Sequence, residues 1–135
     1  MTSVRIERDT TGTYTATNEK GAEIRLGSAS DTLSPVELML AAIGGCTAID
    51  VDTVTSRRAK PDSFVVEVAG DKVKDETGNR VENITVTFRI KFPDGEAGDE
   101  ARAILPDIVR KSHDRLCTVS RTVERGTPVT TSIEP

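Results

Sequence analysis

The chain has 135 residues, which is enough for one compact domain and too few for two comfortable ones, so we expect a single domain over residues 1–135. Its 18 Lys and Arg stand against 22 Asp and Glu, and it has one Tyr, three Phe and no Trp. This acidic, aromatic-poor composition offers neither the basic surface nor the stacking platforms on which nucleic-acid binding depends. The two cysteines, Cys46 and Cys117, are too few for a disulfide-dense secreted scaffold.

The N-terminal part of the chain alternates between short extended runs and turn residues. Three runs are predicted to be antiparallel strands, over residues 4–7, 13–17 and 23–26. The first residues carry charges of both signs and no apolar run, so the pattern does not predict a signal peptide. We therefore expect a cytoplasmic protein, in which thiols are normally held reduced and a thiol pair is more often redox-active or ligating than structural.

A long helix is predicted next, over about residues 35–58. Ser34 at the N-cap, Pro35 at the first helical position and Glu37 two residues later form a capping box. Residues 38–49 carry no charged side chain, a run too short to span a membrane. A helix that is apolar on every face must be buried on every face, and we expect a second subunit to supply part of that cover.

A glycine pair interrupts this apolar run. Gly44 and Gly45 each cost about 1 kcal/mol in a helix interior, which suggests that another backbone packs closely there. A hairpin follows, with strands around residues 64–68 and 84–92 and a turn at 75–79. The second strand alternates most clearly between an apolar and a polar face.

The C-terminal third is predicted to hold two helices and a strand. An amphipathic helix over about 99–116 keeps its periodicity through Pro106. A short helix over 118–125 is closed by Gly126, and a last strand is expected at about 128–133. The complete order, βββ-α-ββ-α-α-β, is typical of an α+β fold with antiparallel sheet.

Each cysteine allows two interpretations from its position. Cys46 lies in the apolar helix after the glycine pair, where it is either a small buried hydrophobe or a nucleophilic thiolate in a pocket that the glycines open. Cys117 is either an ordinary helix-end residue or the start of the short helix. In the second case free N–H groups and the helix dipole lower its pKa, helped by Arg115 and Arg121.

Metal binding and hydrolysis are weaker hypotheses for these residues. His113 is the one histidine and precedes Cys117 by one helical turn, but the chain has no CxxC, no HExxH and no second His. A Cys–His hydrolase needs a base aligned with its nucleophile, and His113 stands beside charged residues typical of a solvated helix face. We therefore predict no metal site and no cofactor.

The chain carries three notable motifs, SPVEL at 34–38, GGCTA at 44–48 and CTVSRT at 117–122. Together with the element order over nearly the whole chain, they resemble the OsmC/Ohr family, the osmotically inducible and organic-hydroperoxide-resistance proteins. The likeness is to the OsmC-like branch. It implies an OsmC-like fold, in which antiparallel sheets pack around a long buried central helix, and an intertwined homodimer with two active sites at the interface.

The resemblance also implies a chemistry. Cys46 matches the peroxidatic cysteine, which attacks the O–O bond of an organic hydroperoxide, releases an alcohol and becomes a sulfenic acid. Cys117 matches the resolving cysteine, which condenses with Cys46 to a disulfide that an external dithiol reduces. The implied partners are a second copy of the chain, the hydroperoxide and the dithiol, with no nucleic acid and no membrane.

Two supporting residues are implied as well, a Glu and an Arg that activate the thiolate. The aligned Glu position holds Val36, and the nearest acid is Glu37, which the capping box already explains. At 100° per residue, Glu37 lies on the opposite side of the helix from Cys46. Arg25 lies near the position of the family's Arg.

The alternative hypothesis is a redox-sensing or small apolar ligand-binding protein on the same fold, without efficient peroxidase turnover. The apolar Val36 favours this alternative, whereas retention of both cysteines favours the enzyme.

Overall fold

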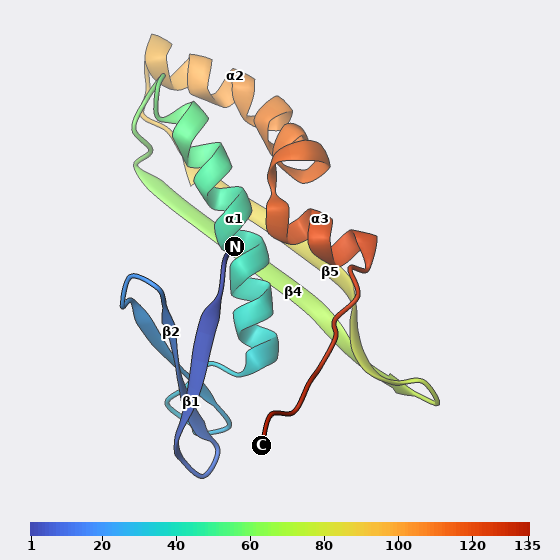
Figure 1. Ribbon diagram of the computed structural model, residues 1–135. Helices are drawn as coiled ribbons and strands as arrows, with labels where there is room; N and C mark the ends of the chain where they lie inside the picture. The colour runs from blue at the N-terminus through green and yellow to red at the C-terminus, as the bar shows by residue number, and fades with distance from the viewer. The chain divides into compact units, whose positions relative to one another are not determined.

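The computed structural model describes residues 1–135 and divides them into two compact units, residues 1–41 and 42–135, with helix α1 running from one into the other (Figure 1). The elements in chain order are β1 (Val4–Thr10), β2 (Thr13–Asn18), β3 (Glu23–Gly27), α1 (Pro35–Thr55), β4 (Ser63–Asp75), β5 (Gly78–Lys91), α2 (Glu96–Lys111), a π-helical turn η1 (Ser112–Leu116) and α3 (Thr118–Arg125). This mixed α+β architecture with antiparallel sheets is the predicted fold class.

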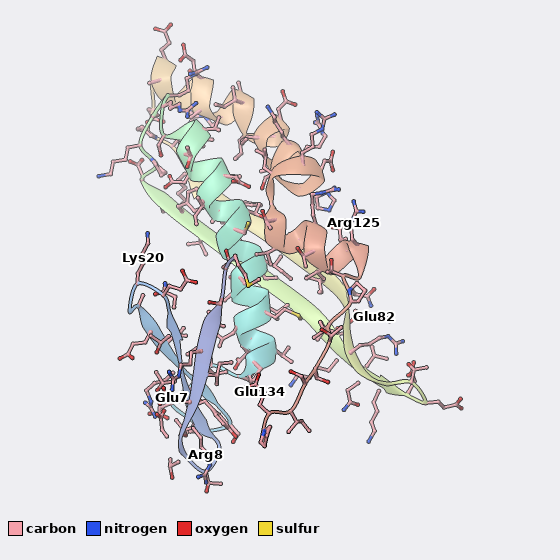
Figure 2. All side chains as sticks on the ribbon, in the orientation of Figure 1. Glu7, Arg8, Lys20, Glu82, Arg125 and Glu134 are labelled. Atoms are coloured by element: carbon pink, nitrogen blue, oxygen red, sulfur yellow. The ribbon has the colours of Figure 1, made fainter.

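The N-terminal unit contains a three-stranded antiparallel sheet in the order β1-β2-β3, as the alternating runs predicted. Every residue of β1 is exposed, including the charged Glu7 and Arg8 (Figure 2), and Thr13 is the one buried residue of this unit. Gly27 approaches the carbonyl of Gly12 so closely that a Cβ would overlap it, so this crossing requires glycine. The sheet is therefore held by its backbone hydrogen bonds more than by a core of its own.

Helix α1 begins with the predicted capping box. The backbone N–H of Ser34 donates to Glu37 Oε1 over 2.8 Å, and the N–H of Glu37 donates to Ser34 Oγ over 3.1 Å. The regular helix ends at Thr55, slightly before the expected residue 58, and a turn leads to Pro61. By length and composition alone α1 could cross a membrane, a test that the core helix of a soluble protein also passes.

In the C-terminal unit, α1 packs against the β4–β5 hairpin, whose Val68 pairs with Val86. A Cβ on Gly44 would lie 2.6 Å from Val68 Cγ2, so the predicted close approach at this glycine is confirmed, with a valine side chain as the neighbour rather than a backbone. Gly45 has nothing within 4 Å of its Cβ position. Only the first of the two glycines is therefore explained by packing within the chain.

The helices after the hairpin form the rest of this unit. Helix α2 continues through Pro106, as its periodicity predicted, and starts a little earlier than expected. A small core of Ala59, Phe92 and Ala101, with Ile90 and Leu105 against it, joins the helices to the hairpin. Helix α3 ends at Gly126, whose left-handed backbone (φ 63°, ψ 45°) is the conformation that favours glycine at a helix end.

Two expectations from the sequence are wrong for the single chain. The predicted last strand at 128–133 is absent, and Val129 and Ile133 are 88% and 97% exposed, because an extended segment needs a neighbouring strand to satisfy its backbone and none lies beside it. Helix α1 is not buried on every face, since Ile49 is 69% exposed. The chain supplies cover for one side of α1 only, and cover by a second subunit stays a prediction.

Candidate functional site

The two cysteines are neighbouring free thiols in the C-terminal unit. Cys46 projects from the middle of α1 and is half-buried, whereas Cys117 is 0% exposed and occupies the N-cap of α3. The expectation that Cys117 starts the short helix is therefore confirmed. A half-buried and a buried sulfur that neighbour each other are an arrangement that a disulfide can close.

The pKa of the Cys46 thiol is raised. Burial is the largest cause, and the neighbouring Cys117 and the carboxylate of Asp50 act in the same direction. The backbone N–H of Val119, in the first turn of α3, donates to the sulfur and opposes them without prevailing. At neutral pH Cys46 is therefore held mainly as a thiol.

The pKa of the Cys117 thiol is lowered instead. Burial alone would raise it, but hydrogen bonds from the Ser120 hydroxyl, Thr47 and the Ser120 backbone together outweigh burial. The Ser120 N–H lies 3.3 Å from Cys117 Sγ, and the Ser120 hydroxyl lies 3.2 Å from it. Arg121, which the sequence suggested as a charge partner, donates to the Asp114 carbonyl over 2.8 Å.

Both sulfurs thus use the same helix end. Val119 and Ser120 are consecutive residues in the first turn of α3, and their N–H groups, which have no partner inside the helix, point to Cys46 and Cys117 respectively. The C-terminal end of α3 carries Arg125, and the helix dipole favours a positive charge at that end (Figure 2). This helix end can stabilise negative charge on either sulfur.

A cavity of about 320 Å³ lies beside the pair, between α1, β5, α2 and α3. Thr47 and Ser120, which both contact Cys117, line it together with His113 and Glu124. The remaining lining is apolar and consists of Ile43, Ile84, Val86, Phe88, Val109 and Val123. The space is suited to an apolar group a few carbon atoms long.

His113 bridges two carboxylates next to this cavity. Its Nδ1 lies 2.9 Å from Asp114 Oδ1 and its Nε2 lies 2.7 Å from Glu124 Oε1. The hydrogen bond with Asp114 and the charge of Glu124 raise the pKa of the imidazole against the effect of burial. His113 is therefore an ion-pair residue that links η1 to α3, and it does not contact either sulfur in the way a catalytic base would.

The other two predicted site residues lie in the N-terminal unit. Glu37 completes the capping box of α1, and Arg25, on β3, forms an exposed ion pair with Asp31 at 3.3 Å. The structure therefore brings together the two cysteines of the predicted set. No group of three or more His, Cys, Asp and Glu side chains is placed to hold a metal ion.

Sequence reasoning missed the residues that surround the sulfurs. Ser112 donates its hydroxyl to Asp50 Oδ2 over 2.7 Å, and its carbonyl accepts the backbone N–H of Cys117 over 2.8 Å. Asp50 stands one helical turn after Cys46, and that spacing is the signal that could have identified it. Ser112 carries no comparable signal because its role arises from the π-helical turn.

Comparison with known proteins gives a consistent result. The model of the OsmC-like protein family matches residues 27–132. An uncharacterized protein of Mycobacterium tuberculosis is 30% identical over 132 residues, which cover 96% of this chain and 93% of that protein.

Among solved structures, an OsmC-like protein of unknown function from Vibrio cholerae superposes with a TM-score of 0.73 at 15% identity, covering 92% of this chain and 94% of that one. An organic hydroperoxide resistance protein of Bacillus subtilis superposes with a TM-score of 0.54 at 18% identity, covering 94% of this chain and 92% of that one. The family model covers most of the chain and the fold agrees with it, so the chain belongs to the family of OsmC-like proteins.

Proposed function

We propose that the protein is a thiol-dependent peroxidase that reduces organic hydroperoxides and takes part in defence against oxidative stress. The observation that carries the proposal is the pair of neighbouring free thiols at the N-terminus of α3, one half-buried and the other fully buried. An accessible thiol that is oxidised first and a hidden one that follows are the two parts that such a cycle needs.

The cycle begins at Cys46 because its sulfur is the more accessible. Its thiolate attacks the distal oxygen of the hydroperoxide, the O–O bond breaks, and the alcohol leaves with the thiol proton while Cys46 becomes a sulfenic acid. The sulfur of Cys117 then attacks the Cys46 sulfur, forming an S–S bond and releasing water. An external dithiol reduces the disulfide and is itself oxidised to a disulfide.

The preference for organic over hydrogen peroxide is supported by the cavity beside the pair. It extends from Thr47, the residue next to Cys46, along the apolar face of β5. Burying an alkyl or aryl group there gains about 0.8 kcal/mol for each CH₂ removed from water, and hydrogen peroxide has no such group. We place the reaction in the cytoplasm, where reductants hold thiols ready for the next turnover.

We also propose that the working form is a homodimer. Ile49 is 69% exposed on the apolar helix α1, and residues 127–135 expose Val129 and Ile133 without a partner strand. Apolar surface of this kind is typical of an interface. Light scattering is expected to give twice the chain mass, and a stable monomer would contradict this part of the proposal.

Family resemblance assigns thiolate activation to an acid and an arginine, for which Glu37 and Arg25 are the candidates in this chain. Glu37 is already engaged in the capping box, while the ion pair of Arg25 with Asp31 is exposed and worth little. If they activate the thiol, Arg25→Gln and Glu37→Gln slow peroxide consumption. If the capping box alone explains Glu37, Glu37→Gln leaves the stability and the rate nearly unchanged, because the amide oxygen of Gln still accepts the Ser34 N–H.

A redox sensor on the same fold is the second candidate, and the raised pKa of Cys46 favours it because a mostly protonated thiol reacts slowly. Steady-state consumption of cumene hydroperoxide and of hydrogen peroxide, with dithiothreitol as reductant, separates the two. The peroxidase predicts multiple turnovers with a clear preference for cumene hydroperoxide. Consumption no faster than that of free thiol would leave the sensor as the better account.

A further inference from the structure

Asp50 and Ser112 join the segment that holds Cys46 to the segment that holds Cys117. Asp50 follows Cys46 by one helical turn, a spacing that puts two side chains on one face with Cβ atoms about 5–6 Å apart. The half-buried carboxylate of Asp50 accepts a 2.7 Å hydrogen bond from Ser112, which is 0% exposed. Because water does not reach the Ser112 hydroxyl, this bond has no solvent competitor on the serine side.

The other end of Ser112 holds the backbone of Cys117. Its carbonyl accepts the Cys117 N–H over 2.8 Å, the hydrogen bond that closes η1. A π-helical turn is a rare conformation that needs tertiary support. Asp50 supplies support through the hydroxyl, so one residue of α1 fixes the turn from which Cys117 is presented.

We propose that Asp50 and Ser112 are positioning residues for disulfide formation, holding η1 so that the sulfur of Cys117 stays directed at Cys46. The inference rests on the proposed function in so far as the two cysteines must form a disulfide, but it does not require that the oxidant be a peroxide. With glutathione disulfide as oxidant, Cys46 first forms a mixed disulfide and releases one glutathione thiolate. The Cys117 thiolate then attacks the Cys46 sulfur, and the second glutathione leaves as thiolate.

Asp50 is expected to slow the reaction of the Cys46 sulfur and to speed the closure of the disulfide by Cys117. Two titratable groups, Asp50 from α1 and Cys117 from the start of α3, face the Cys46 sulfur, and the carboxylate disfavours its ionisation. Asp50→Asn removes that charge and is expected to speed alkylation of Cys46 about threefold at neutral pH, as one unit charge about 6 Å away in water-like surroundings would. The same variant weakens the hold on Ser112 and slows ring closure, because small misplacements of reacting groups cost large factors in rate.

Ser112→Ala separates the effect of the Asp50 charge on Cys46 from the effect of the Asp50–Ser112 hydrogen bond on closure. It removes the hydroxyl but leaves the charge of Asp50, so it is expected to slow closure without speeding alkylation. A pair that served only the stability of the fold would leave closure of the disulfide at the wild-type rate in the folded variants, whereas faster alkylation of Asp50→Asn reports the loss of the charge alone. The measurement that distinguishes positioning from folding is therefore the comparison of two rates in the same protein.

The chain offers a control at the end of the same helix. Ser56, in the turn just after α1, donates its hydroxyl to Asp52 Oδ1 over 2.8 Å, an exposed serine–aspartate bond between near neighbours in the sequence. Asp52→Asn and Ser56→Ala should leave both rates at the wild-type value. Thermal unfolding of all four variants shows how much of any effect is loss of folded protein.

The experiment reacts reduced full-length protein with glutathione disulfide, quenches with acid and follows the mixed disulfide and the Cys46–Cys117 disulfide by mass spectrometry. Alkylation by iodoacetamide across pH is measured in a Cys117→Ser background. We expect closure to be about tenfold slower or more in Asp50→Asn and Ser112→Ala, with the mixed disulfide accumulating, and alkylation to be faster in Asp50→Asn only.

Closure at the wild-type rate in both variants overturns the proposal, as does equal slowing in the Asp52 and Ser56 controls. If Asp50→Asn does not fold, Ser112→Ala decides by itself, since it removes a single hydroxyl. Wild-type protein that closes the disulfide with glutathione disulfide but consumes no organic hydroperoxide would refute the proposed peroxidase while leaving this inference intact. Failure of the wild type to close with glutathione disulfide overturns the inference.

Discussion

The middle of α1 and the start of α3 each hold one cysteine, and the two places treat a thiol in opposite ways. Within α1 the amides are engaged in the helix, so Cys46 depends on the Val119 N–H of another helix, and burial with Asp50 nearby raises its pKa. At the N-cap of α3 the Ser120 hydroxyl, Thr47 and the Ser120 N–H together lower the pKa of Cys117, although it is the more deeply buried. At Cys117 the hydrogen bonds from Ser120 and Thr47 therefore outweigh burial, whereas at Cys46 burial outweighs the single amide.

As a result, the more acidic thiol and the more solvent-accessible thiol are different residues. The sulfur that ionises more readily is 0% exposed, and the sulfur that solvent reaches is held mainly as a thiol. Reaction with a dissolved oxidant needs both properties, so the order of events depends on which limits the rate. The predictions below alter one property at a time.

The largest effect is expected from exchanging each cysteine for serine. Cys46→Ser should abolish peroxide consumption above the background of a free thiol, because Cys117 is out of reach. Cys117→Ser should still reduce about one equivalent of peroxide but stop at a Cys46 sulfenic acid, which dimedone traps. Two results would contradict the assigned order. Either both variants lose consumption of the first equivalent of peroxide equally, or dimedone traps a sulfenic acid at Cys117 in the wild type.

A smaller effect is expected where α1 meets β4. The Cβ of Gly44→Ala would lie 2.6 Å from Val68 Cγ2, so repacking should lower the free energy of unfolding by about 1–3 kcal/mol despite the better helix propensity of alanine. Gly45→Ala meets nothing within 4 Å inside the chain and should raise it by up to about 1 kcal/mol. Urea denaturation measures both.

The sign at Gly45 also tests the proposed dimer. If a second copy of the chain packs at this position, the added methyl group clashes with it and Gly45→Ala weakens the assembly. A destabilising Gly45→Ala whose effect depends on protein concentration would thus support the homodimer, while the predicted gain would show that this face is not a tight interface.

Loss of the Ser120 hydroxyl is expected to lower the acid dissociation constant of the Cys117 thiol about fivefold. Ser120→Ala removes a hydrogen bond to the Cys117 sulfur and keeps the backbone N–H, so the pKa of Cys117 should rise by an amount that corresponds to about 1 kcal/mol. Ultraviolet absorbance of the thiolate, recorded against pH in a Cys46→Ser background, gives the shift. An unchanged titration would show that Thr47 and the Ser120 backbone N–H set the acidity without the hydroxyl.

The smallest effect concerns His113. Because its pKa is raised in the folded protein, through Asp114 first and Glu124, the added stability is present below the ordinary imidazole pKa and is lost as pH rises through the raised value. Since the ion pairs are exposed, His113→Gln should cost about 0.5 kcal/mol in mildly acidic solution and nothing in alkaline solution. A pH-independent difference would contradict this reading of the pair.

Much of the fold could be predicted because its local signals are strong. The capping box at Ser34 and Glu37, the alternation of β5 and the glycine closing α3 all have near-neighbour causes, and all three are confirmed. The last strand was predicted by the same kind of alternation and is wrong for the single chain. A strand is completed by a distant neighbour, which local sequence does not supply.

The candidate site also combines features that local sequence predicts with features that depend on distant residues. Cys46 and Cys117 could be singled out by their places in the helical pattern, but their opposite pKa shifts arise from Val119, Ser120 and Thr47, whose positions depend on how α3 docks on α1. The contact between Asp50 and Ser112 joins residues 62 positions apart. Such partners are set by tertiary packing, which periodicity does not encode.

The most direct test of the central claim is to add one equivalent of cumene hydroperoxide to the reduced protein and identify the products by mass spectrometry. The account predicts loss of the peroxide, one equivalent of the alcohol and an intact chain in which Cys46 and Cys117 are joined by a disulfide. Peroxide that persists, or oxidation that leaves the two cysteines unlinked in a folded protein, would contradict it.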